Sequence, residues 1–362
     1  MGIEDKIKDI ADEIQSTPYN KASQHHIGKL KAKLAHLRMQ MEAGKGGKKG
    51  AASIGYSIKK SGDATVVLAG FPSVGKSTLL NALSGEELSK VAAYEFTTLT
   101  VIPAMLIYKG ARIQLLDVPG LITGASRGKG RGKEVLGVLR NADMLIILAE
   151  AEKQWQFDSI KEELYNAGIR LNQNPPRVEI EKKIKGGINI SKAINCQLTD
   201  NEIIAVLNEF GYNSADITIK ENISVEQLID VVASNRKYAK ALFVLNKIDS
   251  VEKEKLPNSR DIVQISAEDK VGIEELKDAI YKKLGFSRVY LKPPGKEPDF
   301  VNPLILPEGA TIKDVCDKLH REFRRKFKYA QVTGKSAKFK EQRVGLEHKI
   351  ADEDIVTVFT RE

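Results

Sequence analysis

The sequence predicts an α/β protein whose main domain contains a mostly parallel, doubly wound sheet. Continuous apolar runs occupy residues 64–69, 100–107, 111–116, 143–149 and 241–245. These runs are too apolar for strands that keep one face in water, and amphipathic helical segments alternate with them. Buried strands that alternate with helices are typical of a parallel sheet covered by helices on both faces.

The overall composition indicates a multidomain globular protein. The chain has 362 residues, of which 42% are hydrophobic, and this length predicts two or three domains. The only two cysteines, Cys196 and Cys316, exclude a disulfide framework and a cysteine-based zinc site, so we expect a reducing compartment. No run of about 18 apolar residues occurs, so we expect no membrane span.

Changes in pattern along the chain predict five segments. Isoleucines and leucines at helical spacing predict a helical hairpin over residues 1–43, and a basic Gly/Lys linker follows over 44–62. The main α/β domain is predicted over 63–173 and 237–287, interrupted by a small α+β insert over 174–236. A last α+β domain covers 288–362, where short strands surround one helix predicted over 312–327. The apolar residues Val315, Leu319, Phe323 and Phe327 of this helix are expected to face the sheet.

The strongest motif is GFPSVGKS at residues 70–77, between the first apolar run and an amphipathic helix. It matches G-x-x-x-x-G-K-[ST], in which backbone N–H groups at a helix start surround phosphate oxygens. Lys76 is placed to reach the β and γ phosphates, and the Ser77 hydroxyl to bind Mg²⁺. A chance glycine-rich turn is the alternative, which the flanking strand and helix disfavour. The predicted phosphate-binding residues are Gly70, Phe71, Pro72, Ser73, Val74, Gly75, Lys76, Ser77 and Thr78.

Two further segments complete the predicted phosphate site. Asp117 begins the sequence DVPG at the end of an apolar run, so we expect it to hold Mg²⁺, while the Gly120 N–H meets the γ-phosphate. Thr98, or failing that Thr97, is expected to complete the Mg²⁺ shell when a γ-phosphate is present. Taken alone, D-x-P-G is a tight turn and a Thr pair indicates only strand propensity.

The sequence NKID after the fifth apolar run predicts guanine recognition. The Asp249 carboxylate can accept from both guanine N1–H and the exocyclic amine, and the Lys247 stem can lie along the ring. Asn246 is expected to tie this loop to the phosphate-binding loop, and backbone N–H groups at Ser266 and Ala267 to meet guanine O6. Alone, N-K-x-D is also a helix cap or turn, and ATP is the alternative nucleotide.

Positive charge is concentrated in the flanking segments. The chain carries 57 Lys and Arg against 48 Asp and Glu, a net charge of +9, of which residues 1–60 contribute +6 and residues 288–362 contribute +4. This distribution favours an anionic partner such as RNA, although a solubilising surface is the alternative. The predicted RNA contacts on the last helix are Lys318, Arg321, Arg324, Arg325 and Lys328.

The ordered set GFPSVGKS, YEFTT, DVPG, NKID and SAE, with GASRGKGRG after DVPG, resembles the Obg-related GTPases, and within them the developmentally regulated GTP-binding (DRG) proteins of archaea and eukaryotes. The terminal LKPPGKEPDF and LPEGATIKDVCDKLH are similar to a TGS domain. The resemblance spans the whole chain. It implies a P-loop GTPase domain with a ribosomal-protein-S5-like insert and a ubiquitin-like β-grasp TGS domain. It also implies a monomeric, cytoplasmic enzyme that binds GTP or GDP and Mg²⁺, associates with the ribosome or RNA, and has a stabilising protein partner.

One position departs from the Ras pattern. Leu121 follows DVPG where Ras-like enzymes have the glutamine that orients the attacking water, so we expect slow intrinsic turnover. K⁺ near the phosphate-binding loop is one candidate activator, although Ser73 stands where K⁺-stimulated relatives have Asn. Arg131 or Arg127 is another candidate, and both arginines can instead bind RNA or face solvent. The alternative function is an RNA- or ribosome-binding assembly module that keeps GTP or GDP as a structural ligand.

Overall fold

The computed structural model describes residues 2–18, 23–44, 61–84, 102–118, 132–257 and 259–361. The chain divides into two compact units, which are considered separately. One unit contains Met1–Gly55 and Gly168–Tyr238, and the other contains Tyr56–Ala167 and Ala239–Glu362. The second unit therefore holds the predicted nucleotide-binding segments and the C-terminal domain.

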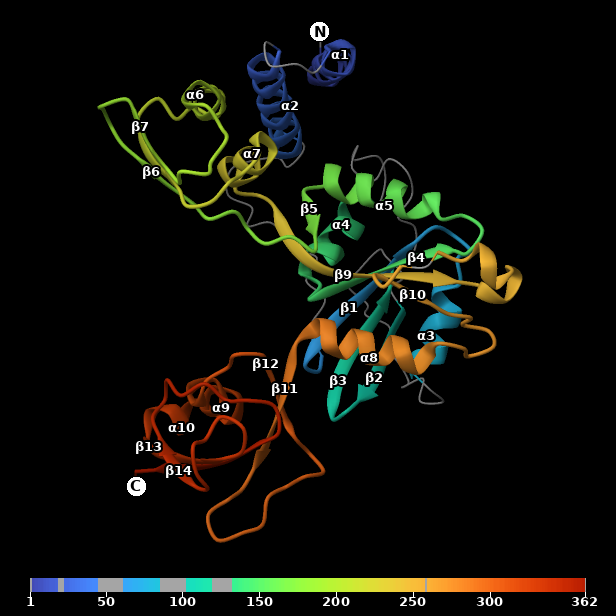
Figure 1. Cartoon of the computed structure of the whole chain (residues 1–362), viewed down its shortest axis with the longest axis vertical. Coiled ribbons are helices and arrows are strands. Elements are labelled where there is room, and N and C mark those ends of the chain that lie inside the picture. Colours follow the sequence, from blue (N-terminus) through green and yellow to red (C-terminus); the bar gives the residue numbers. More distant parts are fainter. Residues whose placement is uncertain are drawn as a thin grey trace. The chain divides into compact units, whose positions relative to one another are not determined.

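The larger unit is built on the predicted parallel sheet (Figure 1). Its strands are β1 (Ala64–Gly70), β2 (Ile102–Tyr108), β3 (Ala111–Asp117), β4 (Met144–Glu150), β9 (Lys237–Asn246) and β10 (Ile262–Gln264). They follow the order β10-β9-β4-β1-β3-β2. The short β5 (Ile169–Leu171) belongs to the other unit. β1 pairs in parallel with β3 and β4, β4 pairs in parallel with β9, and β9 with β10, while β2 runs antiparallel to β3. The parallel strands bring the ends of β1, β3, β4 and β9 to one edge of the sheet.

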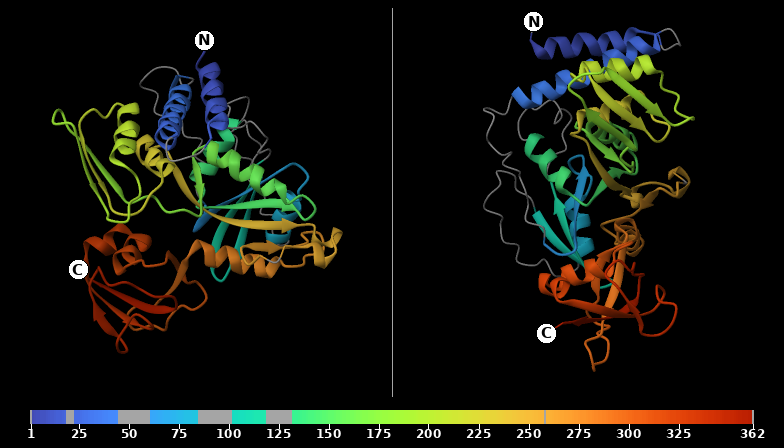
Figure 2. Two further views of the ribbon diagram at one scale, coloured as in Figure 1. Left: turned by 45° about the horizontal axis from the view of Figure 1, so that its top comes forward. Right: turned by 90° about the vertical axis from the view of Figure 1, so that its left-hand side faces the viewer.

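Helices cover both faces of this sheet (Figure 2). The helices are α3 (Lys76–Ser84), α4 (Gly132–Asn141), α5 (Trp155–Asn166) and α8 (Ile273–Leu284). Val66 and Leu68 of β1 share one buried cluster with α3 and α8, and α4 and α5 lie on the opposite side. Since β1 is buried along its whole length, its continuous apolar run needs partners on both faces.

The other unit joins the N-terminal helices to the insert. The helices are α1 (Ile3–Ser16) and α2 (Gln24–Gly44), and the insert comprises β6 (Val178–Lys182), β7 (Ile188–Lys192), α6 (Asp200–Glu209), β8 (Ala215–Ile219) and α7 (Val225–Ala233). The insert strands form a sheet in the order β6-β8-β7. Ala32 of α2 is fully buried within the same apolar cluster as Leu207 of α6 and Leu228 of α7. The insert core is thus completed by a helix from the start of the chain.

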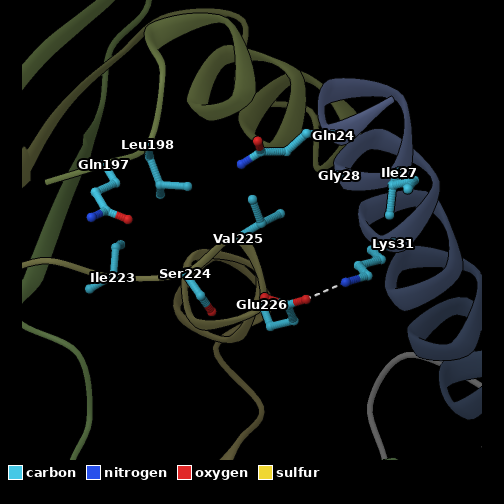
Figure 3. Close-up of a pocket in the computed structure, with 10 residues that line it drawn as sticks. All are labelled: Gln24, Ile27, Gly28, Lys31, Gln197, Leu198, Ile223, Ser224, Val225 and Glu226. Atoms are coloured by element: carbon cyan, nitrogen blue, oxygen red, sulfur yellow. Dashed lines mark hydrogen bonds and ion pairs between the residues drawn. The ribbon is translucent and has the colours of Figure 1, made fainter. Parts of the chain in front are cut away.

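A small hollow lies where α2 meets the insert (Figure 3). Its volume is about 190 Å³, and α2, the segment at Gln197 and Leu198, and the start of α7 line it. Lys31 of α2 forms an ion pair with Glu226 of α7 at its edge. Burial opposes ionisation of Glu226, but the hydrogen bond from Lys31 and those near the helix start hold the pKa of this carboxyl below its usual value.

The C-terminal domain is a five-stranded sheet packed against two short helices. Its elements are β11 (Phe286–Leu291), β12 (Leu304–Pro307), α9 (Ile312–Leu319), α10 (Arg321–Arg325), β13 (Phe327–Thr333), β14 (Gln342–Val344) and β15 (Asp354–Thr360). The strand order is β12-β11-β15-β13-β14. Val315 and Cys316 of α9 pack with Ala330, Val332 and Val356 of the sheet, so one sheet face is covered and forms the domain core.

The prediction of one continuous helix over 312–327 is wrong. His320 has an extended backbone (φ −172°, ψ 145°), which ends α9, and its ring Nδ1 accepts a hydrogen bond from the Glu322 N–H at the start of α10. Strand β13 then begins at Phe327. As a result, Lys328 lies on a strand, and Phe323, predicted to face the sheet, is 37% exposed. Phe327, in contrast, packs against the domain core as expected.

Candidate nucleotide-binding site

The phosphate-binding loop connects β1 to α3 as the sequence predicts. Gly75 has a φ of +93° and Ser73 a φ of +62°, so the chain turns through left-handed backbone conformations before the helix begins at Lys76. A Cβ at Gly75 would overlap the Asn246 amide nitrogen, which makes glycine necessary there. The turn brings Lys76 and Ser77 to the first turn of α3, where backbone N–H groups are free of intrahelical partners.

The Lys76 ammonium is held within the loop. Its Nζ donates to the carbonyl oxygens of Gly70, at 3.1 Å, and Phe71, at 2.9 Å. Burial lowers the pKa of Lys76 from its usual value, while the nearby Asp117 carboxylate acts in the opposite direction. Since the ammonium is buried among carbonyl oxygens, it can exchange these acceptors for phosphate oxygens with little loss of solvation.

Ser77 and Asp117 face each other across the start of α3 and the end of β3. The Ser77 hydroxyl donates to Asp117 Oδ2 at 2.8 Å. The second carboxylate oxygen, Asp117 Oδ1, is buried and has no hydrogen-bond partner in the part of the chain that the structure describes. A buried carboxylate oxygen without a partner is costly unless a cation or donor completes it. This pair of oxygen donors therefore fits Mg²⁺, which prefers oxygen ligands.

Several predicted site residues lie outside the described residues. These are Thr97 and Thr98, Gly120 and Leu121, and Arg127 and Arg131. The predicted third Mg²⁺ ligand, the γ-phosphate N–H donor and the candidate arginines therefore stay predictions from sequence.

Asn246 joins the base-recognition loop to the phosphate-binding loop, which confirms the predicted tie. Its side chain is 2% exposed, and its Nδ2 donates to the Val74 carbonyl oxygen at 2.9 Å. Its Oδ1 accepts from the Ala267 N–H at 3.0 Å. One amide group thus fixes the distances between three loops that are far apart in the sequence.

Lys247 bridges the same two loops from a left-handed backbone conformation (φ +62°). Its Nζ donates to the Ser73 carbonyl oxygen at 2.8 Å. Asp249 follows in a short 3₁₀ helix, Ile248–Ser250, with its carboxylate exposed and available for a base. Ser266 is buried, and its hydroxyl donates to Asp269 Oδ2 at 3.0 Å, so its side chain shapes the turn that carries the Ala267 N–H.

Glu150 is a site residue that the sequence analysis did not identify. It ends β4 in register with Asn246, and Glu150 Oε1 lies 3.3 Å from Lys247 Nζ, while Oε2 accepts from Lys153 at 2.7 Å. Burial opposes its ionisation, but the hydrogen bonds from Lys153 and Lys247 hold the pKa of Glu150 below its usual value. The sequence feature that could have identified Glu150 is its position directly after the fourth apolar run, at the end of a buried strand.

An aromatic pair lies at the rim of the phosphate-binding loop. Trp155, the only tryptophan of the chain, is 59% exposed at the start of α5. Its ring meets the Phe71 ring edge-on, with the centroids 5.4 Å apart. The indole therefore lies next to the phosphate-binding loop and provides an intrinsic fluorescence reporter.

The predicted RNA contacts are spread over α9, α10 and β13. Three of them pair with carboxylates: Lys318 with Asp63, Arg324 with Asp317 and Arg325 with Glu322, each at 3.1 Å. Arg321 and Lys328 have no carboxylate partner in the described segments. Much of the charge on this helical surface is thus already neutralised within the protein.

Comparison with known proteins identifies three family regions. The model of the 50S ribosome-binding GTPases matches residues 65–183, a C-terminal region of the same domain family matches 185–286, and the TGS domain matches 287–360. No helix among the described residues is long and apolar enough to span a bilayer.

Curated relatives match along nearly the full length. An uncharacterized GTP-binding protein of Methanocaldococcus jannaschii is 52% identical, over 99% of this chain and 93% of its own. The Developmentally-regulated GTP-binding protein 2 homolog of Dictyostelium discoideum is 44% identical over 99% of both chains. The Ribosome-interacting GTPase 1 of Saccharomyces cerevisiae is also 44% identical over 99% of both chains.

Proposed function

Because the chain belongs to the developmentally regulated GTP-binding protein family of GTPases, we propose that it hydrolyses GTP with Mg²⁺ and acts as a ribosome- or RNA-associated switch in translation. The observation that carries this proposal is the Ser77–Asp117 pair. In this pair the Ser77 hydroxyl donates to one Asp117 oxygen, and the other, buried carboxylate oxygen beside Lys76 has no hydrogen-bond partner among the residues that the structure describes. Such an arrangement needs a cation and an anionic ligand together, as a nucleotide triphosphate with its metal provides.

Different residues of the described site would bind the metal, the phosphates and the base. Ser77 and Asp117 would hold Mg²⁺, which when bound neutralises charge on the β- and γ-phosphates. Lys76 would release the Gly70 and Phe71 carbonyl oxygens and donate to phosphate oxygens. Asp249 would accept the two guanine donors, and Lys247, anchored on Ser73, would place its stem along the ring.

The proposed hydrolytic step depends on groups outside the described residues. Thr98 and Gly120 would contact Mg²⁺ and the γ-phosphate, and Arg131 is the candidate cation for the transferring phosphoryl group. Since Leu121 has no polar side chain to orient water, we propose slow intrinsic turnover and stimulation by a partner or by K⁺. Cytoplasmic localisation and a stabilising protein partner are part of the same proposal, which rests on the family alone.

The proposed ribosome association rests on the names of one relative and one family, and on the charge of this chain. One relative is named a ribosome-interacting GTPase, and the matching family model describes ribosome-binding GTPases. The basic segments at both ends of this chain are compatible with a polyanionic partner.

The decisive experiment is multiple-turnover GTP hydrolysis with and without purified ribosomes, at matched K⁺ and Na⁺ concentrations. We expect slow turnover alone, an increase with ribosomes, and loss of Mg²⁺-dependent nucleotide binding in Asp117→Asn. Arg131→Ala in single-turnover assays tests the arginine separately. Absence of turnover under all conditions, with GTP still bound, would instead support an assembly module that uses the nucleotide as a structural ligand. Competition of ATP against GTP tests the role of Asp249.

A further inference from the structure

The sheet of the C-terminal domain has one face that its helices do not cover. Ala330, Val332 and Val356 point into the core with α9, so the alternate residues of β13 and β15 point to the opposite face. The strand registers place Tyr329 opposite Phe359, Gln331 opposite Thr357 and Arg343, and Thr333 opposite Ile355. The residues at these register positions include no acidic side chain.

A preorganised row of flat groups crosses three neighbouring strands of the open face. The Tyr329 and Phe359 rings are stacked, with their centroids 4.6 Å apart and their planes inclined by 20°. The Arg343 guanidinium lies 4.7 Å from the Tyr329 centroid. The two rings are half-buried and Arg343 is exposed. Aromatic and guanidinium planes are the groups on which proteins stack unpaired bases.

The charge around this row differs from that of the helical surface. Lys326 and Arg361 lie at the strand ends next to Tyr329 and Phe359, where the Arg361 N–H donates to the Lys326 carbonyl oxygen at 2.7 Å. Both side chains are exposed, and neither has a carboxylate partner in the described part of the domain. In contrast, Arg324 on α10 is paired with Asp317. Uncompensated cations beside stacking planes fit a chain of phosphates with exposed bases.

We propose that this open face, defined by Arg343, Tyr329, Gln331 and Phe359, binds single-stranded RNA. Bases extend the stacked row, the Gln331 amide offers both a donor and an acceptor to a base edge, and the cations at the strand ends contact phosphates. The proposal deepens the proposed association with ribosomal or other RNA, and it moves the contact from α9 and α10 to the sheet.

The test measures binding of a fluorescently labelled, unstructured 12-nucleotide RNA to the full-length protein by anisotropy at two salt concentrations. We expect Arg343→Ala and Phe359→Leu to weaken binding by about tenfold or more, the effect of losing one stacked base. Arg324→Ala is the matched control and should change affinity by less than about twofold, because its guanidinium is already paired.

Arg343→Ala removes an exposed side chain, so it tests the proposal even if Phe359→Leu proves unstable in thermal unfolding. The proposal is overturned if the parent does not bind the single strand, if it prefers a duplex, or if Arg324→Ala loses affinity while Arg343→Ala keeps it. If Arg343→Ala changes neither the RNA affinity nor the ribosome-stimulated GTP hydrolysis, the proposal that the open face binds RNA is wrong, and the GTPase proposal stands. If the parent does not hydrolyse GTP but Arg343→Ala weakens RNA binding as expected, the GTPase proposal is wrong, and the RNA-binding proposal stands.

Discussion

Replacement of Asn246 by alanine tests whether one buried amide holds the nucleotide site together. The change removes the partners of the Val74 carbonyl oxygen and the Ala267 N–H. Val74 is 0% exposed and Ala267 4% exposed, so water cannot fully replace the lost bonds. Each buried group left unpaired costs about 1–3 kcal/mol, so we expect the free energy of unfolding of the larger unit to fall by about 3 kcal/mol.

The fluorescence of Trp155 during urea titration of the nucleotide-free protein measures this loss. Trp155 is the only tryptophan and lies in the larger unit, beside Phe71, so the signal does not mix the two units. With a urea dependence of about 2 kcal/mol per molar, the midpoint should fall by about 1.5 M. GDP affinity should also fall, because the phosphate-binding and base-recognition loops are no longer tied together.

Asn141→Ala is the matched control within the same unit. Asn141 is exposed, and its amide donates to the Gly137 carbonyl oxygen at 3.0 Å, so the substitution should change stability by less than about 0.5 kcal/mol. An unchanged midpoint and GDP affinity in Asn246→Ala would refute the reasoning that this amide connects the loops.

Three further changes test other parts of the structure. Glu150→Gln should weaken GDP binding several-fold with little effect on the unfolding midpoint, because Lys247 loses the carboxylate that holds its ammonium group. Lys153→Met, which removes the other partner of Glu150, is the control. Equal effects on GDP affinity in both variants would contradict a role of Glu150 in positioning Lys247. Arg170→Met should destabilise the smaller unit by about 2–3 kcal/mol in circular dichroism melts, since it removes one of the two arginines that pair with buried Asp230 and leaves Arg236 as the other, whereas a loss under 1 kcal/mol would argue against this ion pair as a core element. Burial raises the pKa of the Cys316 thiol to about 11. The thiol therefore loses its proton at lower pH in the unfolded state than in the folded state, and the free energy of unfolding should fall as the pH rises from about 9 to 11. Cys316→Ala should flatten this dependence, and identical pH profiles of the two proteins would exclude the thiol as its source.

The nucleotide site was largely predictable because its motifs are local. GFPSVGKS places its glycines and Lys76 at a strand–helix junction through backbone geometry alone, and the structure has that junction. Similarly, NKID follows a buried strand, so the topology of a parallel sheet brings it to the same edge as the phosphate loop. Glu150 was missed because an acidic residue after a strand has many uses, and only its distance to Lys247 distinguishes them.

The predicted single helix at 312–327 failed for a local reason that competes with periodicity. Apolar residues continue at helical spacing past His320, but the imidazole caps a new helix and the extended backbone at that residue ends the first one. Since a helical pattern does not reveal which side chain will cap a new helix, the sequence-based expectation that Phe323 faces the sheet was wrong.

The class of fold, the order of the motifs and the residue types at the nucleotide site follow from the order of the amino acids, because each depends on neighbours within a few positions. Which distant segments share a core, and which charges remain unpaired, depends on how the chain folds. Ala32 completes the insert core from the other end of the chain, and Arg324 is neutralised by Asp317 while Arg343 lies on an aromatic ring. Packing and ion pairing act between surfaces brought together by folding, so net charge along the sequence could indicate an anionic partner without locating where it binds.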